Sequence, residues 1–240
     1  MKKLFLFLLL SLSVAGSVSA QTTINDANAE VRSVGAFTGL SVATGIKVYV
    51  TQSSSEAVAI SASTKEYRDK IVTEVVNGVL KIYYKSDWKG NTNIKNSMQL
   101  KAYVSVKTLN ILRASSGSNL EVKDKLSVGD IDIDISSGAN VRVALSAGNV
   151  KVRQGSGAVS KFSGNAKSLD IAVNSGANFD GEGFAVDVCD ADASSGGRID
   201  ISVNKELSAS ASSGGDIRYS GSATIKKVSN SSGGSIKKAK

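Results

Sequence analysis

The stretch Ile131-Asp-Ile-Asp-Ile135, Ser136-Ser-Gly-Ala-Asn140, Val141-Arg-Val143 decides the fold of this chain. Apolar and charged residues alternate on both sides of a cluster of serine, glycine and asparagine. Alternation with a period of two is typical of β-strands, and such clusters are typical of turns. The stretch therefore predicts a strand, a tight turn and a second strand.

The same unit recurs along the second half of the chain. A unit this short buries its apolar face only by stacking on its neighbours. We therefore predict an all-β fold, a parallel β-helix or solenoid with about seven Ser-Gly-turn coils of 18–21 residues. The glycine of each turn supplies a positive φ or a close backbone approach, so it is predicted to be structural. These glycines are Gly117, Gly138, Gly157, Gly176, Gly196, Gly214 and Gly233.

Aligning the copies on this glycine separates inward from outward positions. The third residue after it is apolar in six of seven copies and is predicted to point inward: Leu120, Val141, Ser160, Phe179, Ile199, Ile217 and Ile236. The fifth residue before it forms a second inner column: Leu112, Ile133, Val152, Ile171, Ala191, Ala209 and Val228. The fourth residue after it is always charged and is predicted to point outward: Glu121, Arg142, Lys161, Asp180, Asp200, Arg218 and Lys237. On adjacent parallel strands, opposite charges in this column would favour the correct register.

The first half, residues 30–108, predicts strands without the short repeat. Segments 46–50, 58–60 and 100–104 alternate, and Asn77-Gly78 between two apolar runs predicts a hairpin. We expect this part to extend or wrap the solenoid and to cap one end, because a stack of open coils needs a cap. At the other end, the basic tail of residues 237–240 would discourage end-to-end pairing.

The N-terminus carries an export pattern. Lys2 and Lys3 precede a short apolar run, and small residues at 18–20 suit cleavage, so residues 1–20 predict a signal peptide. The predicted layout continues with a flexible segment at 21–29 and one domain at 30–236, comprising N-terminal strands at 30–108 and repeat coils at 109–236. No cysteine directly follows the apolar run, so we expect a periplasmic, outer-surface or extracellular protein rather than a lipoprotein.

Composition excludes several classes of function. The chain has no histidine and no proline, and its formal net charge is +8. Without histidine the chain lacks any Ser-His pair, the commonest general base and the commonest metal ligand, and we expect no cofactor and no metal. Basic residues interleaved with stacking aromatics are missing, which argues against nucleic acid as a partner. The single cysteine, Cys189, falls in an inner column and is predicted to pack as a small apolar residue.

Residues 37–52, from Phe37-Thr-Gly-Leu-Ser to Val50-Thr-Gln52, together with 71–82 and the Ser-Gly repeats, resemble the bacterial "putative auto-transporter adhesin, head GIN domain" family. The resemblance covers roughly residues 30–235 and implies an exported β-helical domain compared with adhesin heads. Lys47 stands where the family name implies asparagine. We recognise no C-terminal membrane-barrel segment, so we do not expect an autotransporter by itself. The family supplies no catalytic residues.

Three functions stay open at this point. The first is an exported, non-enzymatic binding module that contacts a glycan or an envelope protein, with Tyr83, Tyr84 and Trp88 as a ligand-contact patch. The alternative use of these aromatics is packing at the solenoid's end. The second is a polysaccharide-active β-helix enzyme, since paired carboxylates cleave glycosides; its candidates are Asp130, Asp132, Asp134, Asp187, Asp190 and Asp192. The third is a structural envelope scaffold that forms oligomers. For the second function, the alternative is that Lys151 and Arg153 pair with the candidate aspartates and make them structural.

Overall fold

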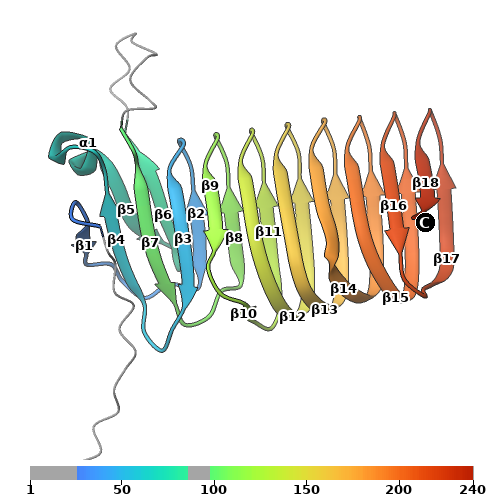
Figure 1. Ribbon diagram of the computed structural model, residues 1–240, viewed down its shortest axis with the longest axis horizontal. Coiled ribbons are helices and arrows are strands. Elements are labelled where there is room, and N and C mark those ends of the chain that lie inside the picture. The colour runs from blue at the N-terminus through green and yellow to red at the C-terminus, as the bar shows by residue number, and fades with distance from the viewer. Residues whose placement is uncertain (1–25, 86–97, 240) are drawn as a thin grey trace, which may run out of the picture.

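The computed structural model describes residues 26–85 and 98–239. The predicted signal peptide and the loop that carries Trp88 lie outside these ranges. The described chain forms one coiled sheet with a single short helix (Figure 1). Its elements are β1 (Glu30–Arg32), β2 (Gly39–Val42), β3 (Lys47–Gln52), β4 (Ala57–Ser61), α1 (Lys65–Asp69), β5 (Ile71–Val76), β6 (Val79–Tyr84), β7 (Lys101–Val106), β8 (Ile111–Ala114), β9 (Asn119–Val122), β10 (Leu126–Ser127), β11 (Ile131–Ile135), β12 (Asn140–Gln154), β13 (Val159–Val173), β14 (Asn178–Ala193), β15 (Arg198–Ala211), β16 (Asp216–Ser220), β17 (Thr224–Asn230) and β18 (Ser235–Lys238).

The predicted β-solenoid is confirmed. Each coil contributes one strand to each of two faces. Face A runs β5–β6–β2–β8–β11, continues through the second halves of β12 to β15, and ends at β17. Face B runs β1–β4–β7–β3–β9, continues through the first halves of β12 to β15, and ends at β16 and β18. Pairing along both faces is parallel except where β1, β4 and β5 join.

The Ser-Gly turns lie in one row along the edge of the solenoid (Figure 1). In all seven, the serine has φ of 46–52° and the glycine φ of 67–78°, so both central residues are left-handed. This is the conformation of a type I′ turn, which suits the twist of paired strands. The amide of each glycine from Gly117 to Gly214 donates to the serine carbonyl of the next turn at 2.9–3.2 Å. The turns therefore form a hydrogen-bonded ladder of their own.

The two inner columns point inward as expected. Leu112, Ile133 and Leu120 are fully buried, and so are their counterparts in the following coils. Ser160 is the polar exception, and its hydroxyl donates to Gln154 Oε1 at 2.6 Å. Gln154 Nε2 in turn donates to the carbonyls of residues 158 and 178, which satisfies this buried polar group. The columns lose their cover only in the last coil, where Val228 is 48% exposed.

The outward charged column has the expected register, but its ion pairs differ in part. Lys161 Nζ lies 2.7 Å from Asp180 on the next coil, as predicted. Asp200, by contrast, pairs with Arg198 of its own strand at 2.9 Å and is only 8% exposed. Glu121 and Arg218 likewise pair with residues two positions away in the chain, Lys123 and Asp216. Side chains two residues apart share one face of a strand, so they compete with the neighbouring coil for the same charge.

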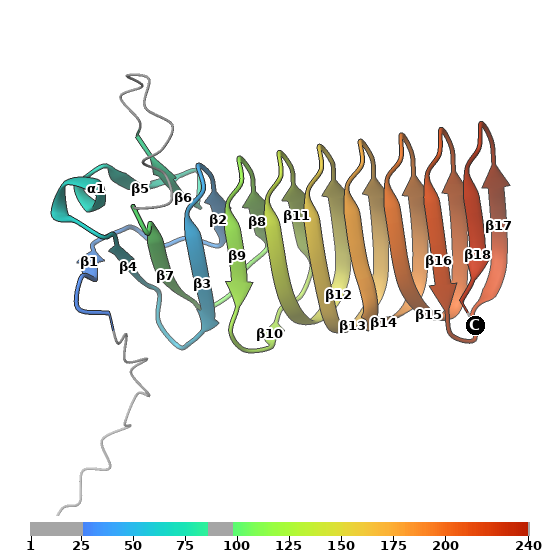
Figure 2. The ribbon, with the colours of Figure 1, turned by 45° about the horizontal axis from the view of Figure 1, so that its top comes forward.

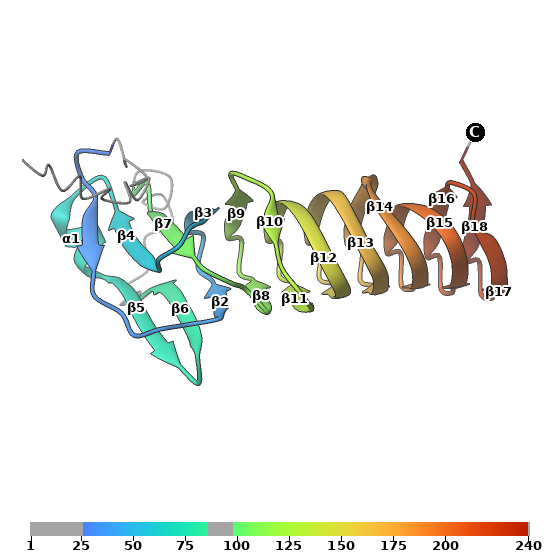
Figure 3. The ribbon, with the colours of Figure 1, turned by 90° about the horizontal axis from the view of Figure 1, so that it is seen from below.

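The N-terminal part adds two coils and a cap. The predicted hairpin at Asn77-Gly78 joins β5 and β6. Strands β6 and β7 form the outermost coil, whereas β2 and β3 form the next one, so the chain passes over the β2–β3 coil to reach β8. Strands β5, β4 and β1 then cover the end in antiparallel pairing (Figure 2). Seen from below, β4, β7 and β3 lie in one layer and β5, β6 and β2 in the other (Figure 3).

Candidate functional site

The strongest surface feature comes from a short pattern that occurs twice. Lys47-Val-Tyr-Val50 in β3 and Lys101-Ala-Tyr-Val104 in β7 have the same Lys-x-Tyr-Val order. The two strands pair in parallel, with Lys47 beside Lys101 and Tyr49 beside Tyr103. Because alternate residues share a face, all four side chains lie on the outer side of face B. We call these four residues and Lys123 the Tyr–Lys face.

The two tyrosines form an ordered aromatic pair. Their ring centroids lie 5.5 Å apart with an interplanar angle of 18°, which is a stacked arrangement. Lys123 Nζ lies 4.4 Å from the centroid of the Tyr49 ring, and Lys47 Nζ lies 5.1 Å from it. Both distances are typical of cation–π contacts. The strand pairing and these contacts hold an aromatic surface beside two positive charges.

Asp26 anchors the part of the Tyr–Lys face that β7 contributes. Its Oδ2 accepts a hydrogen bond from the Tyr103 hydroxyl at 2.9 Å and lies 3.3 Å from Lys101 Nζ. Burial and the hydrogen bond to Asp26 raise the pKa of Tyr103 to about 12. Burial alone would raise the pKa of Asp26, but hydrogen bonds from Tyr103 and neighbouring groups outweigh it and lower that pKa. At neutral pH, Tyr103 is therefore a neutral donor that is held in place by a carboxylate.

Cations and amides extend the Tyr–Lys face toward the repeat coils. Asn119 lies beside Lys47 in the next coil, and Asn140 lies beside Asn119. The hydrogen bond to Tyr49 and the nearby carboxylate of Glu121 raise the pKa of Lys47, whereas burial and the nearby Arg142 act to lower it. Among the described residues, neither Lys47 nor Arg142 forms an ion pair. Two available positive charges thus lie next to two amides and a tyrosine pair.

The ligand-contact patch predicted from sequence is only partly described. Tyr83 and Tyr84 are neighbours in β6 and point to opposite faces of the strand, so they do not form one surface together. The Tyr83 hydroxyl lies 3.3 Å from Glu74, and Tyr84 packs partly against the core. Trp88 lies outside the described residues, so ligand contact by Tyr83, Tyr84 and Trp88 stays a prediction.

The candidate catalytic aspartates are held mainly in ion pairs and hydrogen bonds. Arg153 donates to both oxygens of Asp132 at 3.0 Å and to Asp134 at 3.1 Å. Asp130 accepts from Asn149, and Asp187 pairs with Lys205 at 2.9 Å. Asp190 and Asp192 are exposed on face A. This arrangement is that of a register-setting charge ladder, as expected for charges on neighbouring parallel strands.

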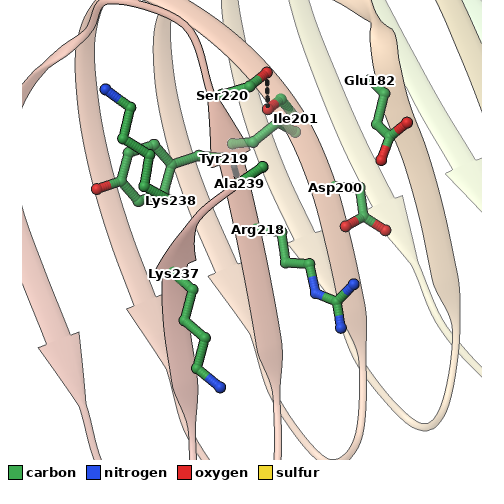
Figure 4. Close-up of a pocket in the computed structure, with 9 residues that line it drawn as sticks. All are labelled: Glu182, Asp200, Ile201, Arg218, Tyr219, Ser220, Lys237, Lys238 and Ala239. Atoms are coloured by element: carbon green, nitrogen blue, oxygen red, sulfur yellow. Dashed lines mark hydrogen bonds between the residues drawn. The ribbon is translucent and has the colours of Figure 1, made fainter.

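A hollow lies near the end of the repeat coils (Figure 4). Its volume is about 510 Å³, and its lining combines the cations Arg218, Lys237 and Lys238 with the acids Glu182 and Asp200. Arg218 lies between Asp200 and Lys237, whereas Tyr219 and Lys238 lie on the other side of the strand (Figure 4). Arg218 pairs with Asp216 at 3.3 Å, which leaves the two lysines as the available charges.

The remaining features are the cysteine thiol, possible metal ligands and possible membrane-spanning helices. Cys189 is buried, and burial raises the pKa of its thiol, as befits the small core residue expected from its column. Within residues 26–85 and 98–239, no three histidine, cysteine or acidic side chains gather in a way that could hold a metal ion. None of the helical structure in those ranges is long and apolar enough to cross a membrane.

The fold and this surface define a class of protein, a rigid β-solenoid that displays side chains on flat outer faces. The family model described as "Putative auto-transporter adhesin, head GIN domain" matches residues 36–223. The chain belongs to that family, as its sequence motifs indicated.

Solved structures show the same fold. A putative adhesin from Bacteroides fragilis NCTC 9343 is 20% identical with a TM-score of 0.76, and the alignment covers 88% of this chain and 96% of that one. A putative adhesin from Parabacteroides distasonis ATCC 8503 is 18% identical with a TM-score of 0.65, over 88% and 96%. A protein from the same strain described as a putative lipid binding protein is 17% identical with a TM-score of 0.61, over 90% and 98%. No curated protein matches the chain.

The sequence carries one signal for the Tyr–Lys face, but that signal does not reveal the face by itself. The Lys-x-Tyr-Val pattern occurs twice, but its meaning depends on β3 lying beside β7, and the long stretch of chain between the two strands conceals that pairing.

Proposed function

We propose that the chain is an exported, non-enzymatic, adhesin-like module of the cell envelope or surface that contacts an anionic glycan through the Tyr–Lys face. The observation that carries the proposal is the stacked pair Tyr49–Tyr103 flanked by Lys47 and Lys123 on a rigid sheet. Family membership and the likeness to structures described as adhesins support a surface role. The export pattern at residues 1–20 supports secretion.

The chemistry of the face fits a sugar that carries carboxylates. Lys47 and Arg142 offer charge to an anion, and charge-assisted hydrogen bonds are stronger than neutral ones. Asn119 and Asn140 offer amide donors and acceptors to sugar hydroxyls. The tyrosines offer apolar area at a low cost in side-chain entropy. A neutral glycan would leave the two cations without partners.

The test is binding of fluorescently labelled hexagalacturonate, measured by anisotropy, with maltohexaose as the neutral control. Lys47→Ala and Tyr49→Ala should each weaken binding about fivefold, since an exposed cation–π contact or a charged contact is worth about 1 kcal/mol. Lys151→Ala is the matched control, because this exposed lysine lies on face A, where it pairs with Asp170 at 3.5 Å. Equal losses in all three variants would contradict the assignment of the site. Absence of binding to any acidic glycan would leave the scaffold function.

A further inference from the structure

The two ends of the solenoid are built differently. At the N-terminal end, β5, β4, β1 and α1 cover the outermost coil. At the C-terminal end, β17 pairs only with β15 and β18 only with β16, so within the described residues both strands leave an edge without a neighbour (Figure 2). Proteins normally cover or blunt such edges, because unpaired amides and carbonyls recruit other strands.

At the C-terminal end, apolar side chains that continue the inner columns are exposed. All seven residues of β17 are exposed, including Ile225 at 39% and Val228 at 48%. In register these two residues continue from Leu207 and Ala209, which are 0% and 3% exposed. The turn ladder also stops here, because Gly214 is the last glycine whose amide reaches a further turn. One more coil would bury both apolar side chains and extend the ladder.

The positive charge of the C-terminal end determines which kind of partner could cover it. No acidic residue occurs from 217 to 239, whereas the same segment holds Arg218 and four lysines. Lys226 pairs with Glu206 at 3.3 Å. Within the described ranges, Lys227, Lys237 and Lys238 have no ion pair. Two copies meeting through this end would bring like charges together, which disfavours self-association.

We propose that the C-terminal end docks an acidic extended segment of another protein, which adds strands beside β17 and β18. Main-chain hydrogen bonds would supply affinity, as in other cases of strand addition. Apolar residues of the segment would cover Ile225 and Val228, and its carboxylates would pair with Lys227 and Lys237. The hollow beside Lys237 and Lys238 would receive a side chain from the same segment. The proposal is independent of the Tyr–Lys face, which lies at the other end of the solenoid.

The probe is a synthetic peptide of alternating valine and glutamate, with an alternating valine and lysine peptide as the charge control. A second control is the acidic peptide with alternate amides methylated, which removes strand pairing and keeps the charge. Anisotropy titration with the full chain should show binding of the acidic peptide alone. Hydrogen exchange should show new protection confined to 224–238.

Charge reversal separates this contact from general attraction. Lys227→Glu with Lys237→Glu should weaken binding at least tenfold, whereas Lys85→Glu with Lys167→Glu, far from this end, should leave it within twofold. Circular dichroism should show all variants folded, and hexagalacturonate binding should be the same for the end variant and the unmodified chain. Equal binding by both double variants, or protection outside 224–238, would overturn the proposal. So would a dimer in sedimentation that Val228→Asp dissociates, because a second copy would then be the occupant.

Discussion

Ile133→Asp tests the inner column at its most protected point. Ile133 is 0% exposed and lies between Leu112 and Val152 on the adjoining coils. Removing the buried side chain forfeits about 1.5–3 kcal/mol. The carboxyl that replaces it would need a pKa raised by about 3 units, which costs about 4 kcal/mol at pH 7. The combined loss of about 6 kcal/mol rivals the stability of an ordinary domain.

The assay is guanidinium unfolding followed by circular dichroism, at pH 7 and at pH 4. Since the pKa of the introduced carboxyl is higher in the folded than in the unfolded chain, its charge penalty is largest above the folded-state value. That penalty shrinks as the pH falls toward about 4, where the unfolded carboxyl also binds a proton. Ile133→Asp should therefore be unfolded or severely destabilised at pH 7 and less so at pH 4. Acid effects on the rest of the protein are removed by comparison with Ile133→Val, which should lose only about 1 kcal/mol.

Asp132→Asn is the adjacent outward control. Its side chain is 44% exposed and pairs with Arg153, so its loss should cost at most about 1 kcal/mol. If Ile133→Asp and Asp132→Asn had similar unfolding midpoints, the assignment of inner and outer columns would be refuted.

Four other tests probe separate parts of the structure. Gly157→Ala should destabilise the fold by about 1–2 kcal/mol, because φ is 67° there although the added Cβ meets open space. Gly164→Ala should destabilise it more, because its Cβ would clash with the Leu145 carbonyl. Thermal melts that rank the two variants the other way would contradict this packing. In a urea titration, Ser160→Ala should lower the free energy of unfolding by about 1–3 kcal/mol, because it leaves the buried Gln154 Oε1 without its donor. Ser168→Ala removes only an exposed hydrogen bond and should lower it less. Ultraviolet titration should show one tyrosine with a pKa of about 12; this transition should disappear in Tyr103→Phe and shift to a lower pH in Asp26→Asn. The stability that the raised pKa of Tyr103 contributes is fully present below pH 10 and is lost as the pH rises through 12. Cys189 should react with a thiol reagent only in denaturant, and rapid labelling of the folded chain would contradict its burial.

The repeat half of the fold was predictable because each coil restates the same physical constraints. Position relative to Gly138 decides whether a side chain points inward, and seven copies make that pattern readable from sequence. Partner choice among the charges was less predictable. Asp200 has Asp180 on one side, Arg218 on the other and Arg198 in its own strand, and only the local geometry decides among them.

The N-terminal half was harder, because its order along the solenoid differs from its order in the chain. No local pattern states that β8 lies beside β2 rather than β7. The pairing of Tyr49 with Tyr103 depends on that arrangement, so no local pattern indicated it, whereas the neighbouring aromatics Tyr83, Tyr84 and Trp88 were visible as a candidate patch. The open C-terminal edge was anticipated only through its lysines; the exposure of Ile225 and Val228 required the structure.

The central claim is that the Tyr–Lys face binds an anionic glycan. The most direct measurement is nuclear magnetic resonance of isotopically labelled protein titrated with hexagalacturonate. The claim predicts shifts that saturate and are concentrated at Lys47, Tyr49, Lys101, Tyr103 and Asn119. Saturating shifts on face A, or no shifts at a concentration that saturates binding, would contradict it.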